Sequence, residues 1–258
     1  MSSTTVSIGK VGVENRTSAS PQKYARFAGA LYLLIFFVGP FAFFMGRVGV
    51  VVPGDPAATV ENLMASQSLF RLGIVAETVI VLVEIVVSAI LYVLFRPVSK
   101  PLSLASALAR FAQSILQAVN LFTAAPALLL LGGAGYLTVF SPDQLNALVL
   151  LFADANAFMI IIWGLIFGFH LLLLGYLVFR SGFMPKILGI LLMIGAVGYL
   201  AQSYGHILAP QFDEILSTVV IVLSIPGELL FTVYLLWKGL NAEQWEKRAL
   251  QTTATSSL

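Results

Sequence analysis

The stretch Leu72–Pro101 reads LGIVAETVIVLVEIVVSAILYVLFRPVSKP, and it decides the class of protein. Its apolar run from Leu72 to Phe95 exceeds the roughly 20 residues that an α-helix needs to cross a hydrocarbon layer about 30 Å thick. The run ends in a short turn with two cations and two prolines, and proline stops a helix. The stretch therefore predicts a membrane-spanning helix followed by a tight turn.

The composition of the whole chain agrees with this reading. Of its 258 residues, 59% are hydrophobic and 10% are charged, and the mean hydropathy is +0.96. An ordinary soluble domain has about 25% charged residues. Cysteine is absent, which excludes disulfides, thiolate nucleophiles and cysteine-held zinc or iron–sulfur clusters. The net charge of +2 is attributed to membrane topology, so we expect a lipid bilayer and no nucleic acid as partner.

Apolar runs of similar length recur along the chain and predict an all-α, polytopic six-span transmembrane helix bundle. The Ser/Thr-rich residues 1–22 predict a disordered cytoplasmic tail, and residues 241–258 a second cytoplasmic tail. Between the tails, residues 23–240 form the predicted membrane domain. Its predicted spans are residues 24–46, 72–95, 102–131, 148–180, 187–208 and 215–237.

Prolines and polar caps predict details of these helices. Asp55 before Pro56 is typical of a helix start and predicts a short helix over Pro56–Gln67, on the outer surface, as a connector or as a lid over a cavity. The segment Ser141–Gln144 matches a capping box and predicts that the fourth helix begins there. Pro40 predicts a kink in the first span, and Pro226 before Gly227 predicts either a structural kink or unwinding of the sixth span.

The positions of lysine and arginine predict the orientation, because cations near span ends favour the cytoplasmic side. Only Arg47 and Arg71 would lie outside if the N-terminus is inside. We therefore predict a multi-pass protein of the bacterial cytoplasmic membrane with both termini in the cytoplasm. The cations on that side are Lys10, Arg16, Lys23, Arg26, Arg96, Lys100, Arg110, Arg180, Lys186, Lys238, Lys247 and Arg248.

Four segments together resemble a known family of six-span bacterial membrane proteins, catalogued as domain of unknown function 4386 (DUF4386). The resemblance implies a fold and a place in the cell envelope, and it implies no activity, since none is established for the family. The segments are ARFAGALYLLIFFVGPF (Ala25–Phe41), VVPGDPAATVENLMASQSLFRLGIVAE (Val51–Glu77), LYVLFRPVSK (Leu91–Lys100) and GFHLLLLGYLVFRSGFMPKILGILLMIGAVGYL (Gly168–Leu200).

Motifs of catalysis are missing from the sequence. There is no HExxH, no GxSxG and no P-loop, and the two histidines, His170 and His206, stand far apart. We therefore expect no catalytic residues, no metal and no cofactor, and we do not expect an enzyme.

Ionisable residues inside apolar runs are the functional candidates, because each costs at least about 2.5 kcal/mol near the bilayer centre unless it has a partner or water. Counting 1.5 Å per residue from the cytoplasmic span ends places several of them at one depth. We predict that Arg110 is the central cation of a buried cluster with Glu84 and Glu228. The full set predicted for this layer is Glu84, Arg110, Gln113, His170 and Glu228.

A second polar group falls nearer the outer side and predicts either a vestibule or ordinary interhelical hydrogen bonds and headgroup contacts. In the fourth span, Gly164 and Gly168 form a GxxxG motif, which permits close approach of a neighbouring helix or of a second subunit in a homo-oligomer. The residues predicted for the outer vestibule are Arg71, Glu77, Asn120, Asp154, Asn156, Gln202 and His206.

Two classes of function fit these residues equally. The buried charged layer suggests a small transporter or proton-coupled permease, whereas short loops and the lack of a soluble domain suggest a non-catalytic scaffold or sensor with a structural polar network. An intramembrane enzyme acting on lipids or quinones lacks a nucleophile or metal site. A cavity that brings water to Glu84 or Glu228 would favour transport, and a dry network would favour a scaffold.

Overall fold

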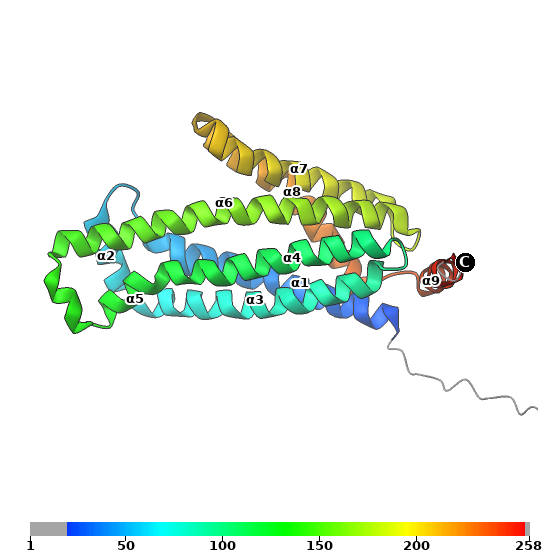
Figure 1. The fold of residues 1–258 in the computed structure, drawn as a ribbon, viewed down its shortest axis with the longest axis horizontal. Coiled ribbons are helices and arrows are strands. Elements are labelled where there is room, and N and C mark those ends of the chain that lie inside the picture. The colour runs from blue at the N-terminus through cyan, green and yellow to red at the C-terminus, as the bar shows by residue number, and fades with distance from the viewer. Residues whose placement is uncertain (1–19, 256–258) are drawn as a thin grey trace, which may run out of the picture.

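The computed structural model describes residues 20–255 and is all-helical over that range, with no strand (Figure 1). Six of its helical segments are long and apolar enough to cross a membrane, which confirms the predicted six-span bundle. The predicted tail of residues 1–22 lies almost wholly outside the described residues. The α-helices are α1 (Pro21–Pro40), α2 (Pro56–Ala65), α3 (Gln67–Phe95), α4 (Lys100–Asn120), α5 (Ala125–Leu131), α6 (Pro142–Ser181), α7 (Lys186–Leu208), α8 (Asp213–Trp237) and α9 (Ala242–Thr255).

Proline disturbs two of the spans and leaves a third intact. The first span changes at Pro40 from α-helix to a π-helical segment, Phe41–Arg47, which a short 3-10 turn, Val48–Val50, follows. The predicted third span is interrupted by a 3-10 turn at Leu121–Ala124, because Pro126 has no N–H to give to the preceding turn. Of the two alternatives predicted at Pro226, unwinding is wrong, since α8 is continuous through this residue.

Both predicted helix caps are present. The Asp55 carboxylate accepts the backbone N–H of Ala58 at 2.9 Å and starts α2. The capping box of Ser141 and Gln144 starts α6, whose 40 residues span about 60 Å. α2 packs on α6 at the end of the bundle opposite α9 (Figure 1), with Leu63 buried beneath it. The short helix thus covers that end of the bundle.

The large hydrophobic core lies at the opposite end. It joins α3, α6, α7 and α8 around side chains such as Leu94, Phe95 and Phe183. α7 packs on the C-terminal half of α6, and α8 packs on α7 and α1. The α7–α8 hairpin leans away from the bundle toward the end covered by α2 (Figure 1). One end of the bundle is therefore closely packed and the other is more open.

Residues Ala242–Thr255 form a helix, α9, within the segment 241–258 that was predicted as a cytoplasmic tail. α9 lies across the packed end of the bundle (Figure 1). The Trp245 indole N–H donates to the carbonyl of Leu94 at 2.8 Å, and the Thr252 hydroxyl donates to the carbonyl of Pro97 at 2.9 Å. These bonds satisfy carbonyls at the end of α3, which explains why a polar helix docks there.

Candidate functional site

α3 contributes two carboxylates to the interior of the bundle. Glu77 and Glu84 are seven residues apart, which is two helical turns, so both point to the same side and lie about 10 Å apart along the axis. The Glu84 residue is 2% exposed, and the Glu77 side chain is 12% exposed. Carboxylates this deep in a bundle require partners.

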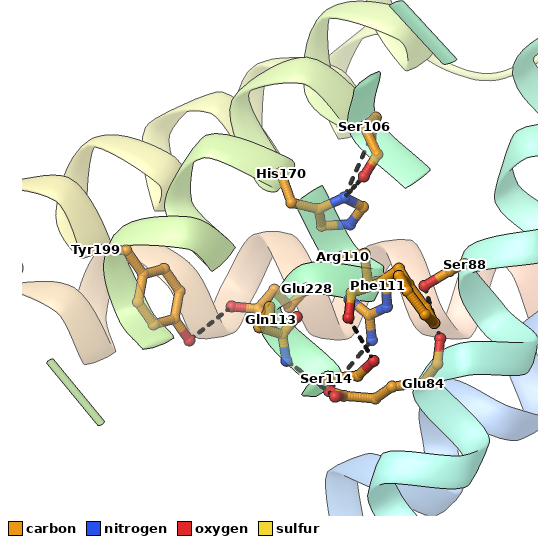
Figure 2. Close-up of polar contacts among 10 residues, drawn as sticks. All are labelled: Glu84, Ser88, Ser106, Arg110, Phe111, Gln113, Ser114, His170, Tyr199 and Glu228. Carbon is orange, nitrogen blue, oxygen red and sulfur yellow. Dashed lines mark hydrogen bonds and ion pairs between the residues drawn. The ribbon is translucent and has the colours of Figure 1, made fainter. Parts of the chain in front are cut away.

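Glu84 finds its partners on α4 (Figure 2). The Gln113 amide nitrogen donates to both carboxylate oxygens, at 3.0 and 2.9 Å, and the Arg110 Nη2 lies 3.7 Å from Oε1. The Arg110 guanidinium also lies over the ring of Tyr32, 4.8 Å from its centroid. Glu84, Arg110 and Gln113 thus form one buried unit. We call Glu84 and Arg110 the inner pair, and the Gln113 amide bridges the two carboxylate oxygens of Glu84.

His170 lies beside this unit and is held by α4 through a different residue. Its Nδ1 is 2.8 Å from the carbonyl oxygen of Ser106 and 3.1 Å from the Ser106 hydroxyl (Figure 2). Since a carbonyl only accepts, Nδ1 carries the proton in this contact. The ring stacks on Phe167 and is fully buried. His170 is therefore fixed by the backbone of α4 and makes no ion pair with a carboxylate in the described chain.

Glu228 does not join the inner pair as an ion-pair partner. Its Oε1 accepts the hydroxyl of Tyr199 at 3.2 Å (Figure 2), and among the contacts of residues 20–255 it has no ion pair with Arg110. α8 packs on α1 and α7, whereas Arg110 is on α4. The prediction of a bridge from Arg110 to both carboxylates is therefore corrected to one pair, with Glu228 close enough only for longer-range attraction.

Glu77 finds its partner in Arg47, at the end of the π-helical segment. The Arg47 Nη1 lies 3.9 Å from Glu77 Oε2, and Nη2 donates to the hydroxyl of Thr123. Arg47 is 6% exposed. Arg47 was predicted to lie outside the membrane, and its pairing with Glu77 was not predicted. The sequence did hold a signal for this pair. Glu77 needs a cation as partner, and Arg47 and Arg71 were the only cations expected on that side of the membrane.

A cavity of about 240 Å³ is lined by Arg47 and Glu77 of one ion pair and by Glu84 of the other. Glu77 and Glu84 both line it, together with polar residues of α4 and α6. A second cavity of about 390 Å³ adjoins it under α2 and shares Arg47 and Asn156 with it. The walls of the first cavity are mostly apolar and include Ile35, Phe43, Ile80, Leu116, Met159, Ile160 and Trp163.

The predicted outer vestibule is brought together only in part. Glu77, Asn120 and Asn156 line the first cavity, and Asp154, Asn156 and Gln202 line the second. Arg71 is exposed on α3. His206 instead meets Asp213 at 2.6 Å near the tip of the α7–α8 hairpin. Both lie away from the two cavities because helical spacing turns Arg71 off the inner face and α7 leans outward at His206.

The glycines of the GxxxG motif pack inside the bundle. A Cβ on Gly164 would lie 3.1 Å from the Ser203 hydroxyl, and one on Gly168 would lie 3.0 Å from Tyr199 Cβ. Both contacts are with α7 of the same chain. The prediction of a homo-oligomer through these glycines is therefore not supported, because α7 occupies the face that a second subunit would need.

These observations define a class: a six-span helical membrane protein with an internal cavity that adjoins one end of the bundle and is closed at the other. The chain belongs to the family described as domain of unknown function (DUF4386), whose model matches residues 27–239. It is similar to an uncharacterized protein of Archaeoglobus fulgidus, with 30% identity over 167 residues, covering 65% of this chain and 83% of that protein. No solved structure matches the chain.

Proposed function

We propose that this protein is a small-solute permease of a cytoplasmic membrane, with the cavity as its solute site. The observation that carries the proposal is the cavity between the two ion pairs, which extends to Glu84. A purely structural network has no need of a space beside its charged groups, since partners that satisfy one another can be closely packed. Irregular helices beside such a space are typical of transporters, and the first span changes at Pro40 from an α-helix to a π-helical segment.

For the orientation we propose that the end covered by α2 faces outward and that α9 lies in the cytoplasm. Support comes from the charge distribution of the short turns, where Arg96, Lys100, Arg180 and Lys186 all lie at the α9 end. Reporter fusions after Val60, Val98, Thr138, Phe183 and Pro210 are expected to report outside, inside, outside, inside and outside. An inverted series would reverse the proposed direction of access.

The test of the cavity uses the natural absence of cysteine. In right-side-out vesicles, Leu116→Cys, which lines the cavity, is expected to react with a membrane-impermeant thiol reagent. The matched control is Val87→Cys, which is fully buried in the packed core and is expected to stay unlabelled. Equal protection of both positions would mean that water does not enter, and the permease proposal would be lost.

Coupling to protons is the finer part of the proposal. Glu77 is the candidate proton carrier, because its contact with Arg47 at 3.9 Å is too long for a hydrogen bond and can be remade. In proteoliposomes with an internal pH dye, solute uptake is expected to acidify the lumen for the wild type and not for Glu77→Gln. Uptake without acidification would leave a permease that carries no protons.

The alternative is a scaffold or sensor with a structural polar network. The packed end favours it, because Leu94, Phe95 and Phe183 are each no more than 2% exposed and α9 covers that end. A scaffold predicts no uptake of any solute and no labelling of Leu116→Cys. The labelling experiment therefore separates the two functions before a solute is known.

A further inference from the structure

Hydrogen-bond donors on the cavity wall indicate what kind of solute fits it. Arg47 Nη1 and Trp163 Nε1 are both buried, both belong to residues that line the cavity, and neither has a hydrogen-bond partner within residues 20–255. Buried donors are nearly always paired in folded proteins. The cavity therefore has surplus donors, which calls for a ligand that brings acceptors.

Arg47 is the stronger of the two donors because it is charged. Its Nη2 is held by the Thr123 hydroxyl, which fixes the plane of the guanidinium. Its Nη1 is 3.9 Å from Glu77 Oε2, beyond hydrogen-bond distance. A guanidinium has five N–H donors and can serve two carboxylates at once. A second carboxylate can therefore bind Arg47 while Glu77 keeps its place.

The remaining walls specify an apolar body for the ligand. Most of the remaining lining residues are apolar, among them Ile80, Leu116 and Met159, and the polar exceptions are Gln117, Asn120 and Asn156. At roughly 30 Å³ for each water-sized group, a volume of about 240 Å³ holds about eight such groups. The size and the wall chemistry suit a flexible aliphatic chain of medium length.

We infer that the cavity binds a medium-chain aliphatic carboxylate, with its head group on Arg47 and its chain directed toward Glu84. This inference rests on the proposed function for the route of entry, but the binding itself does not require transport. The indole N–H of Trp163 lies deeper in α6 than Asn156 by seven residues, about 10 Å, and is free for an acceptor on the ligand or for water near the far end.

The experiment measures thermal stabilisation of the purified protein in nanodiscs by octanoate, octanamide and octylammonium, which share one chain length and differ in the head group. Octanoate is expected to stabilise the wild type, and the other two are expected to bind at least about tenfold more weakly, as a lost charged hydrogen bond implies. Equal stabilisation by all three compounds would overturn the inference without any variant being needed.

Two variants locate the head group. Arg47→Gln is expected to weaken octanoate binding by about tenfold or more. Arg71→Gln removes the other outward cation, which is exposed on α3, and is the matched control expected to bind as the wild type does. Unchanged affinity in Arg47→Gln would overturn the inference. If that variant does not fold, Arg47→Lys, which keeps the charge and loses the planar fork, is expected to bind with intermediate affinity.

The outcomes separate this inference from the permease proposal. In one outcome, octanoate binding depends on Arg47 but radiolabelled octanoate is not taken up into proteoliposomes. That result supports the binding site and refutes the permease proposal. In the other outcome, Leu116→Cys is labelled but the protein binds octanoate no better than octanamide. That result supports a water-filled route and refutes the inference that the ligand is a carboxylate.

Discussion

The two ion pairs on α3 use the same residue types and differ in how completely they are enclosed. Glu84 is held by the Gln113 amide and by Arg110, all from regular helices and all at most 2% exposed. Glu77 pairs with Arg47, which belongs to a π-helical segment, and both residues border the cavity. The comparison shows one carboxylate fixed by the fold and another left able to change partners.

This difference has an energetic meaning. A buried pair barely repays the loss of its water, yet breaking it leaves a charge with neither partner nor water. At the inner pair that penalty applies in full. We call Arg47 and Glu77 the outer pair. There the cavity can supply water, so the penalty is reduced. π-helical segments such as the one that carries Arg47 occur often at functional sites. Stability is expected to depend on the inner pair, and function on the outer pair.

The largest expected effect is that of Arg110→Ala. Removal of this cation leaves Glu84 buried without its charge partner, and we expect a loss of about 3–5 kcal/mol in the free energy of unfolding. Arg110→Lys is expected to recover only part of it, because an ammonium lacks the planar fork. Denaturation in detergent measures both. Wild-type stability of Arg110→Ala would show that the inner pair is not structural.

A smaller effect is expected from the amide that bridges Glu84. Gln113→Leu removes two hydrogen bonds to a buried carboxylate and is expected to cost roughly 2–3 kcal/mol in the same assay. The matched control is Gln117→Leu, one turn further along α4, where the side chain lines the cavity. The control is expected to change stability by less than about 0.5 kcal/mol. Equal losses of stability in Gln113→Leu and Gln117→Leu would contradict the difference between the enclosed Glu84 site and the cavity wall.

Next in size is Arg47→Ala at the outer pair. We expect a loss of about 1–2 kcal/mol, well below that of Arg110→Ala, because water in the cavity solvates Glu77 once its partner is gone. The double-mutant cycle with Glu77→Gln measures the coupling directly. A coupling as large as that between Arg110 and Glu84 would mean that both pairs are equally enclosed.

The smallest effect belongs to an ion pair in water. Glu243 and Lys247 on α9 are exposed, and the hydrogen bond from Lys247, 2.6 Å from Glu243 Oε1, lowers the pKa of that carboxyl. A lowered pKa stabilises the folded state above the ordinary value of about 4.3 and is lost as the pH falls through the lowered value. Glu243→Gln is therefore expected to remove only a slight acid sensitivity of α9, seen as hydrogen exchange of its amides. A marked loss at neutral pH would contradict this.

Much of the fold follows from the sequence because its cause is local. Apolar run length determines the six spans, and the caps at Asp55 and Ser141 depend on residues within one helical turn. Depth counting brought Glu84 and Arg110 to one level, and the structure has them in contact. Counting depth does not give the direction around the helix axis, which is why Glu228 was assigned to the wrong partner.

The parts that could not be predicted depend on packing between distant segments. Arg47 enters the bundle only because the chain after Pro40 winds as a π-helix, which shifts the register of every side chain beyond it. α9 has a low mean hydropathy, and its position depends on carbonyls of Leu94 and Pro97 that the turn after α3 leaves free. Hydropathy and residue spacing therefore predict neither the position of Arg47 nor that of α9.

The contact between α1 and α8 determines when the packing of the membrane domain can be completed during synthesis. Gln22 donates to the carbonyl of Lys238 at 2.5 Å and accepts the N–H of Leu240 at 2.9 Å, while Gly29 lets α1 touch the backbone of α8 at Leu236. At about 5–20 residues per second, a separation of 216 residues takes about 10–40 s to translate. α1 therefore waits beside lipid while the residues between it and the end of α8 are translated, and one flank of α1 is covered only once α8 has been made.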